Sequence, residues 1–178
     1  MILFLNGAFG IGKTTVARAL ARRLARSVLF DPEKIGGPLQ YIARLGGRPV
    51  DDFQDLRSWR TLTGIGLRLA RLTSPNVIVP MSITNLAYLD ELRAGVARFE
   101  PVVAHVCLVA PLAVVQERLR MRGADPRRHH WEYRRAAECC LAHGQRAFAK
   151  QVDASERTPD QLAEDVLALV PLARGRVS

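Results

Sequence analysis

Apolar residues fall along this chain in two alternating patterns. Short apolar segments predict strands at 2–6, 28–31, 76–83 and 102–110, and a weaker one at 150–155. The nearly continuous apolar runs at 2–6, 76–81 and 102–110 indicate strands that are buried on both faces. Between them, apolar positions repeat every three or four residues, which predicts helices at 16–25, 33–45, 53–72, 85–99, 112–122, 131–149 and 158–170. Strands that alternate with helices predict a three-layer α/β fold, in which a five-stranded parallel sheet carries helices on both faces.

No repeat, low-complexity tract or linker interrupts this pattern, so a single domain is expected over residues 1–178. The loop at about 123–130 lies between two predicted helices and is rich in arginine and histidine. The tail after Val170 carries Arg174 and Arg176 and is expected to fray.

The first predicted strand runs directly into a glycine-rich segment, Gly-Ala-Phe-Gly-Ile-Gly-Lys-Thr at 7–14, which then opens a helix. The segment satisfies the phosphate-binding pattern G-x-x-x-x-G-K-[ST], and a preceding strand and a following helix are the context that this pattern requires. An ordinary glycine-rich turn is the alternative, and the motif in its context argues strongly against it. The expected ligand is ATP with Mg²⁺.

Each residue type in this segment has a physical purpose. Glycines let the backbone approach a phosphate closely, and the N–H groups of the loop and of the helix N-terminus form a cradle for anions. Lys13 is expected to reach the β- and γ-phosphates, and the Thr14 hydroxyl to ligate Mg²⁺. The residues expected to bind ATP here are Gly7, Ala8, Phe9, Gly10, Ile11, Gly12, Lys13, Thr14 and Thr15.

Ligands of an open parallel sheet bind at the carboxyl ends of its strands, so the residues that follow each strand are site candidates. Asp31 follows the second strand and could hold a magnesium-bound water or accept a proton from a substrate hydroxyl. It fits a helix N-cap equally well, with Pro32 at the first helical position, and both roles can hold at once. The third strand ends at Met81-Ser82 without an acid, which weakens any case for motor-type ATP hydrolysis.

Arginines are concentrated between the fourth and fifth predicted strands. Arg118 and Arg122 lie four residues apart, on one face of a predicted helix. Arg127 and Arg128 follow in the loop at 123–130. This supply suits a lid that closes over ATP and neutralises the transferring phosphoryl group, and we favour that interpretation over a solvated basic loop because a P-loop requires such a cover.

The net charge is +9, and 23 of the 26 basic residues are arginine. This balance favours anionic partners, unless it reflects base-composition drift alone. No RNA-binding motif and no basic amphipathic helix with an aromatic face appears, so no specific nucleic acid partner is expected. The longest apolar stretch, 102–115, is too short to span a bilayer, while peripheral membrane contact stays open. Three cysteines, two of them adjacent, and no secretory signal predict a reducing, cytoplasmic location.

Four blocks of the sequence together resemble the tunicamycin-resistance protein family. They are NGAFGIGKT near the start, DPEK at 31–34, DDFQ at 51–54 followed by Trp59-Arg60, and VIVPMSI at 77–83. The P-loop is shared with many families, whereas the other three blocks are far more particular to this one. The resemblance extends from residue 1 to about 170 and is strongest in the first 84 residues.

The resemblance implies the P-loop kinase fold of nucleoside-monophosphate kinases, with strand order 2-3-1-4-5. It also implies ATP binding and phosphorylation of tunicamycin or a related uridine-containing nucleoside. Sequestration of the drug without phosphoryl transfer is the alternative, motivated by the missing acid after the third strand. The implied catalytic residues are Lys13, Asp31, Arg118 and Arg122, with Arg118 also in contact with ATP.

An acceptor pocket follows from the same resemblance. Without it, Asp52 fits a helix cap and Trp59 fits core packing. With it, the residues expected to contact the acceptor are Asp31, Glu33, Lys34, Asp52, Phe53, Trp59, Arg60, Met81 and Ser82.

Overall fold

A computed structural model describes residues 1–145 and 147–171, and the tail with Arg174 and Arg176, for which we expected fraying, lies outside them. The strands are β1 (Ile2–Gly7), β2 (Ser27–Leu29), β3 (Asn76–Met81), β4 (Val103–Val109) and β5 (Lys150–Asp153). The helices are α1 (Lys13–Arg23), α2 (Glu33–Leu45), α3 (Arg57–Thr73), α4 (Leu86–Ala97), α5 (Leu112–Met121), α6 (His130–His143) and α7 (Pro159–Leu169), with one 3-10 turn, η1 (Phe53–Asp55).

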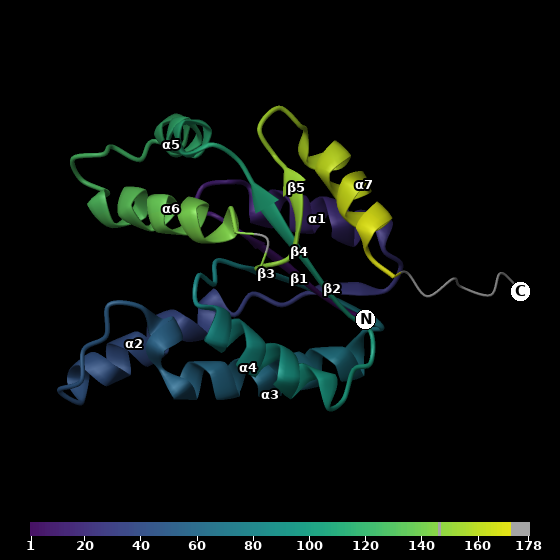
Figure 1. The fold of residues 1–178 in the computed structure, drawn as a ribbon. Helices are drawn as coiled ribbons and strands as arrows, with labels where there is room; N and C mark the ends of the chain where they lie inside the picture. The colour runs from purple at the N-terminus through teal and green to yellow at the C-terminus, as the bar shows by residue number, and fades with distance from the viewer. Residues whose placement is uncertain (146, 172–178) are drawn as a thin grey trace, which may run out of the picture.

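The five strands pair in the order β2-β3-β1-β4-β5, and every pair is parallel. Both the parallel sheet and the order 2-3-1-4-5 are therefore confirmed. In Figure 1, α2, α3 and α4 lie below the sheet, and α1, α5, α6 and α7 lie above it. The result is three layers, with the carboxyl ends of the strands at one edge, where ligands of such sheets bind.

Strand β1 shows why the sheet is covered on both faces. Its alternate residues point to opposite sides. Leu3 and Leu5 join the core under α1, α5, α6 and α7, whereas Ile2 and Phe4 join the core under α3 and α4. All six residues of the strand are buried, so a continuous apolar run is what this position requires.

Pro80 lies in β3, between two neighbouring strands, where a proline is unusual because it has no N–H to donate. Its position explains the tolerance. Strand β2 ends at Leu29, which pairs with Ile78, so no strand runs beside Pro80 on that side.

Two of the predicted helices, at 53–72 and 131–149, differ most from the observed ones. The segment predicted as one helix at 53–72 is split, because Asp52 caps the turn η1 and Leu56 then adopts an extended conformation before α3 begins. Helix α6 ends at His143, six residues before the predicted end, and the chain turns there toward β5. In the described part of the chain, no helix combines the length and the apolar character that crossing a bilayer requires.

Two histidines, the buried His143 and the half-buried His105 with its buried ring nitrogens, predict an acid-sensitive fold. Burial lowers the pKa of His105 and of His143 to about 4, and the ring nitrogens of His105 have no hydrogen-bond partner in the described residues. Because the folded state resists protonation, each neutral ring contributes stability that is complete above about pH 6.5 and is lost as the pH falls toward 4. At pH 5 we expect each histidine to cost about 2 kcal/mol of unfolding free energy, as measured by urea unfolding.

The variant His143→Gln separates this effect from general acid denaturation. Nε2 of His143 donates to the Ile83 carbonyl over 2.6 Å, and a glutamine amide can make a similar bond without titrating. The variant should lose about half of the histidine-dependent acid sensitivity, whereas His130→Gln, at an exposed site, should lose none. Burial raises the pKa values of Glu33 and Asp52, which offsets part of the loss in both variants alike.

Candidate functional site

The phosphate-binding loop (P-loop) connects β1 to α1, and its backbone conformation requires glycine at two positions. Gly10 and Gly12 have φ angles of 89° and 104°, in the left-handed region that glycine adopts freely. A Cβ on Gly10 would lie 2.8 Å from the Leu119 side chain, so α5 packs directly on the loop. The first turn of α1 carries no acidic residue, which leaves its N-terminus available to an anion.

Lys13 is buried beneath this loop, with 8% of its surface exposed. Its Nζ donates to the Ala8 carbonyl over 2.9 Å, so the ammonium group is held within the loop. Burial lowers the pKa of Lys13, and the nearby Glu33 carboxylate partly opposes that shift. The group is therefore a cation that has lost much of its water and gains strongly from an incoming anion.

A cavity of about 330 Å³ opens above the loop. Thr14 and Thr15 are exposed toward it, and their hydroxyls stand where a P-loop places its metal ligand. The cavity is lined by Phe9, Gly10, Gly12, Lys13, Thr14, Thr15, Asp31, Glu33, Pro80 and Arg122. Within the described residues, no group of three or more His, Cys, Asp or Glu side chains could hold a metal. Thr14 is the residue of the loop that could ligate Mg²⁺, together with the phosphates that the ion would accompany.

Two carboxylates, those of Asp31 and Glu33, line the same cavity as Lys13. Oδ1 of Asp31 accepts from the Glu33 backbone N–H over 3.0 Å, so Asp31 caps the start of α2 while it faces the cavity. The bond to the Glu33 N–H fits the capping interpretation of Asp31, whereas its role toward magnesium or a substrate hydroxyl stays a prediction. Burial raises the pKa of Glu33, and Lys13 opposes that shift. The surroundings of Glu33 therefore favour its acting as a proton acceptor.

The expected arginines occupy different positions. Arg122 lines the cavity, as a residue that meets phosphate would. Arg118 instead donates to the carbonyls of Ile11, Ala154 and Ser155, at 3.0, 2.6 and 3.0 Å, and so joins the P-loop to the segment after β5. The same guanidinium borders a second cavity of about 270 Å³ beside Thr15, in keeping with a place next to the nucleotide.

The loop at 123–130 is ordered around Asp125. The Asp125 side chain accepts from the Arg127 N–H over 2.9 Å, and its carbonyl accepts from the His129 N–H over 2.8 Å. Arg127 and Arg128 are exposed and do not line the cavity. Closure of this loop as a lid over ATP stays a prediction.

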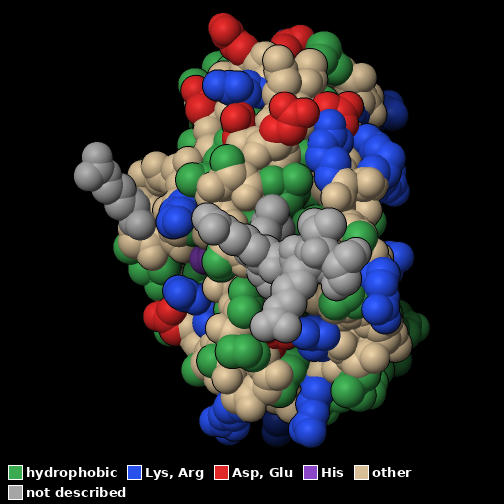
Figure 2. All heavy atoms as spheres, turned by 90° about the vertical axis from the view of Figure 1, so that its right-hand side faces the viewer, with side chains coloured by type: hydrophobic (Ala, Val, Ile, Leu, Met, Phe, Trp, Pro, Cys, Tyr) green, Lys and Arg blue, Asp and Glu red, His purple; other side chains and the backbone are tan. Residues whose placement is uncertain are grey.

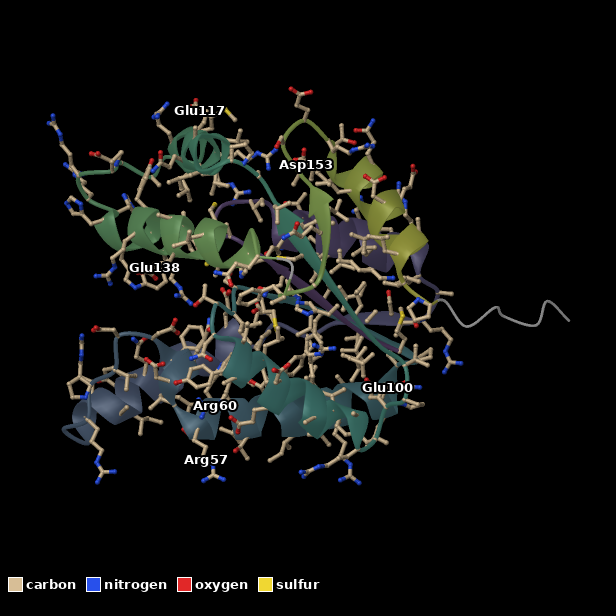
Figure 3. The ribbon with its side chains drawn as sticks, viewed as in Figure 1. Arg57, Arg60, Glu100, Glu117, Glu138 and Asp153 are labelled. Atoms are coloured by element: carbon tan, nitrogen blue, oxygen red, sulfur yellow. The ribbon has the colours of Figure 1, made fainter. Side chains whose placement is uncertain are left out.

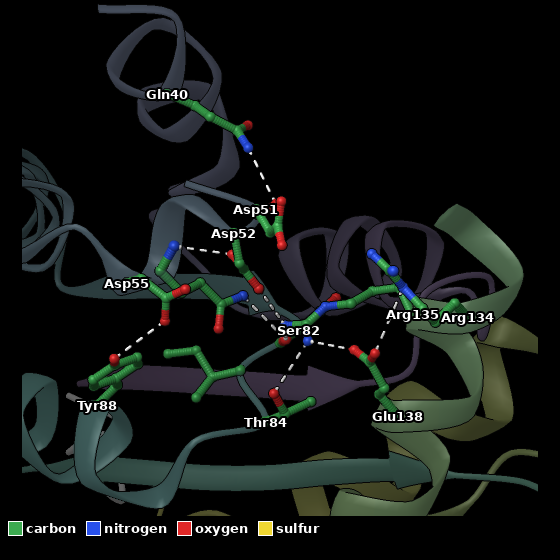
Figure 4. A network of polar contacts seen from close by, with 12 residues as sticks. Gln40, Asp51, Asp52, Asp55, Ser82, Thr84, Tyr88, Arg134, Arg135 and Glu138 are labelled. Atoms are coloured by element: carbon green, nitrogen blue, oxygen red, sulfur yellow. Dashed lines mark hydrogen bonds and ion pairs between the residues drawn. The ribbon is translucent and has the colours of Figure 1, made fainter. Parts of the chain in front are cut away.

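The acceptor side of the site is closed by an ion pair. Arg135 on α6 lies 2.7 Å from Oδ2 of Asp52, and its guanidinium also donates to the Ser82 carbonyl and the Thr84 hydroxyl, both at 3.2 Å (Figure 4). The Asp52 side chain in turn caps η1 by accepting from the Gln54 N–H over 2.9 Å. One arginine thereby fastens α6 to the end of β3 and to the segment before α3.

Only about 30 Å³ of space remains beside this ion pair. Glu33, Phe53 and Ser82 line it, together with Phe9 and Trp131, whose rings meet edge to face at 5.6 Å. The Ser82 hydroxyl is buried beside the Glu33 carboxylate, whose pKa it helps to lower, and it has no partner closer than this carboxylate in the described residues.

The other expected acceptor residues lie away from this space. Trp59 is 1% exposed, donates to the Pro32 carbonyl over 2.9 Å and packs behind Phe53, so it supports the pocket wall from the core. Met81 is also a core residue. Lys34 is exposed and lines neither cavity.

Arg60 is held on the outer side of the η1 segment. It pairs with Glu91 at 2.6 Å, donates to the Gln54 carbonyl over 2.6 Å, and stacks 4.1 Å over the Tyr88 ring. These contacts give it a role in positioning Gln54, whose side chain is buried next to Ser82.

Sequence reasoning did not place Arg135 or Trp131 in the acceptor pocket. Their spacing of four residues on one helix places them on one face, which is a usable signal. It becomes informative only once α6 is known to cover the acceptor side.

We expect Arg135→Met to destabilise the protein by about 2–3 kcal/mol, because it leaves the largely buried Asp52 carboxylate without its cation. Arg134→Gln is the matched control, since Arg134 is the next residue on α6, is 65% exposed and contributes about 0.5 kcal/mol or less. Thermal unfolding of both variants tests the difference. Equal melting temperatures would show that the ion pair does not fasten α6.

Comparisons with known proteins agree with this geometry. The family model described as an AAA domain matches residues 2–154. The chain is similar to the tunicamycin resistance protein of Deinococcus radiodurans, with 32% identity and a TM-score of 0.74 over 94% of this chain and 93% of that one. No curated protein matches the sequence.

Two kinases share the fold at lower identity. A gluconokinase from Sinorhizobium meliloti has 22% identity and a TM-score of 0.66, over 93% of this chain and 89% of that one. A shikimate kinase from Acinetobacter baumannii, solved in complex with shikimate, has 19% identity and a TM-score of 0.61, over 94% and 91%. At these identities the likeness shows the fold alone.

Proposed function

Because this chain belongs to the AAA-domain family and, within it, to the tunicamycin-resistance protein family, we propose that it is an ATP-dependent kinase that phosphorylates a hydroxyl of tunicamycin or of a related uridine-containing nucleoside. One observation carries the proposal. A buried lysine in a glycine cradle faces two carboxylates across a single cavity. This places a phosphate site beside groups that can accept a proton.

The donor side would hold ATP through backbone and charge. The N–H groups of the loop and of α1 bind the phosphates, and Lys13 and Arg122 neutralise the charge of the transferring group. Mg²⁺, held by Thr14 and the phosphates, would supply further charge neutralisation when bound. The cavity beside Arg118 would take the remainder of the nucleotide.

In the transfer itself, the acceptor hydroxyl oxygen forms a bond to the γ-phosphorus. The bond from that phosphorus to the β,γ-bridging oxygen breaks, and ADP leaves with the electron pair. The hydroxyl proton passes to Asp31 or Glu33, the two carboxylates in the cavity. Glu33 also borders the small space beside Arg135, so it connects the donor side to the acceptor side.

A nucleoside is far larger than the space of about 30 Å³ between α6 and η1. Acceptor binding therefore requires α6 to move away from Asp52, which opens the Asp52–Arg135 pair and exposes Phe53 and Ser82. Movements of lids and loops accompany substrate binding in many kinases. We place the reaction in the cytoplasm, where ATP is available.

Sequestration of the drug without transfer is the second candidate, and one observation favours it. The end of β3 brings Pro80 and Ser82 to the site and no carboxylate, so one common means of ordering Mg²⁺ is missing. In that case ATP would act as a structural co-ligand.

Mass measurement separates the two candidates. The full-length protein is incubated with MgATP and tunicamycin, and a kinase yields ADP and a drug species that is heavier by one phosphate. Unmodified drug recovered together with intact ATP would exclude the kinase. Saturable binding of the drug in that sample would then support sequestration.

A further inference from the structure

Helix α3 presents an apolar stripe to the outside of the molecule. Four aliphatic residues, Leu62, Ile65, Leu69 and Leu72, are 40%, 52%, 59% and 78% exposed. Their spacing of three or four residues places them on one side of the helix, opposite the buried Trp59, Thr63 and Leu67. A stripe of this kind on a helix that already packs its other side into a core calls for an external partner.

Unpaired arginines border the stripe. Arg57, Arg68 and Arg98 line a groove of about 720 Å³ between α3 and α4, and none of them forms an ion pair in the described part of the chain. Arg60, in the same groove, is already paired with Glu91. Helix α3 has no acidic residue at all. The groove therefore presents free positive charge beside the aliphatic stripe.

The arginines and the stripe belong to the layer of the fold below the sheet (Figure 1). Arg57 projects downward from this layer, away from the sheet (Figure 3). Along the lower edge of Figure 2, arginine and lysine side chains lie beside hydrophobic ones, whereas acidic side chains gather at the upper end. On the face drawn in Figure 2, the lower end thus carries basic side chains beside hydrophobic ones, while the upper end carries side chains of both charges.

We propose that the α3–α4 face docks on an anionic membrane surface, with the aliphatic stripe in the interface and Arg57, Arg68 and Arg98 on lipid phosphates. A convex helix with aliphatic side chains and flanking arginines matches the geometry of interfacial helices. Arginine stems can lie along the apolar surface while their guanidinium groups reach the headgroups. Helix α3 has no aromatic face of the kind that the sequence analysis considered, because its exposed apolar residues are all aliphatic.

Other partners fit this face less well. Nucleic acid would engage the arginines and leave the leucines exposed to water. A second copy of the chain would bring arginine rows of like charge together. Since the P-loop cavity lies at the strand ends and not on this layer, docking leaves the ATP site open.

Vesicle sedimentation of the full-length protein tests the proposal. We expect binding to vesicles of phosphatidylglycerol and phosphatidylcholine in equal amounts to be at least about tenfold stronger than binding to pure phosphatidylcholine, with a strong dependence on salt. The triple variant Arg57→Gln, Arg68→Gln, Arg98→Gln should lose about tenfold or more. Its matched control removes Arg18, Arg22 and Arg120, which lie on α1 and α5, and should lose far less.

The apolar part has its own matched pair. Leu72 and Leu141 are 78% and 77% exposed, on α3 and on α6. Leu72→Ser should weaken vesicle binding about fivefold, and Leu141→Ser should leave it unchanged. ATP binding, measured in solution, should be the same in all of these variants.

Four results would overturn the proposal. They are equal binding to both kinds of vesicle, no binding to either, equal losses in the α3–α4 variants and their controls, or a concentration-dependent dimer that Leu72→Ser abolishes. The last result would assign the face to a second copy of the chain. None of these tests depends on phosphoryl transfer, so the kinase proposal can fail while this one holds.

Discussion

Lys13→Met is expected to lower ATP affinity or phosphoryl transfer by about a hundredfold or more, because it removes the one ammonium group that is buried in the phosphate cradle. The fold should survive this change. Lys13 is a cation whose pKa burial already lowers, so a methionine of similar length removes a desolvated charge and keeps the packing. Titration calorimetry with MgATP measures the affinity, and urea unfolding checks the stability.

Lys34→Met is the control for this experiment. Lys34 is also a lysine, but it is exposed and lines neither cavity of the site. Its loss should leave ATP binding within about twofold of the parent. Unchanged ATP binding together with unchanged phosphoryl transfer in folded Lys13→Met would refute the phosphate-cradle assignment and, with it, the kinase.

Removing the carboxylates is expected to have the second largest effect. Glu33→Gln or Asp31→Asn should slow phosphoryl transfer by about 10²–10⁴-fold, because each removes a group that can accept the hydroxyl proton. ATP affinity should change little, since the phosphates lie against Lys13 and the loop backbone. Asp51→Asn, an exposed acid in the neighbouring DDFQ block, should leave transfer unaffected.

The two carboxylate variants can also be told apart. Asp31 caps α2, so Asp31→Asn keeps a side-chain oxygen for the Glu33 N–H and should remain stable. Burial raises the pKa of Glu33, so if Glu33 is the base, transfer in the parent should rise with pH through that elevated pKa, and Glu33→Gln should flatten the profile. Full transfer in both variants would show that neither carboxylate accepts the proton. Single-turnover rates across the pH range distinguish these outcomes.

Much of the fold follows from local signals. The continuous apolar run in β1, followed by glycines with left-handed φ angles and then Lys13, leaves few conformations other than strand, loop and helix. The strands were therefore predicted close to their observed bounds. The split of 53–72 into η1 and α3 was missed because the Asp52 cap competes with helical periodicity, and periodicity alone does not show which one prevails.

The candidate site was predictable to a lesser degree. The sequence places Arg118 and Arg122 on one helix face. In the structure, Arg118 donates hydrogen bonds to three carbonyls, whereas Arg122 lines the cavity. Trp59 and Phe53 are close in sequence, but only Phe53 borders the acceptor space. Such differences depend on partners at least 27 residues away in the sequence, which no local pattern encodes.

By itself, the sequence determined the strand–loop–helix unit around Lys13 and the layered sheet, because backbone conformation and hydrophobic periodicity are local properties. Only the tertiary structure decided that Arg135 closes the acceptor side over Asp52, that Glu33 shares the cavity with Asp31, and that α3 turns four aliphatic side chains outward. Those outcomes depend on how distant elements pack, and packing determines which side chains are left without a partner.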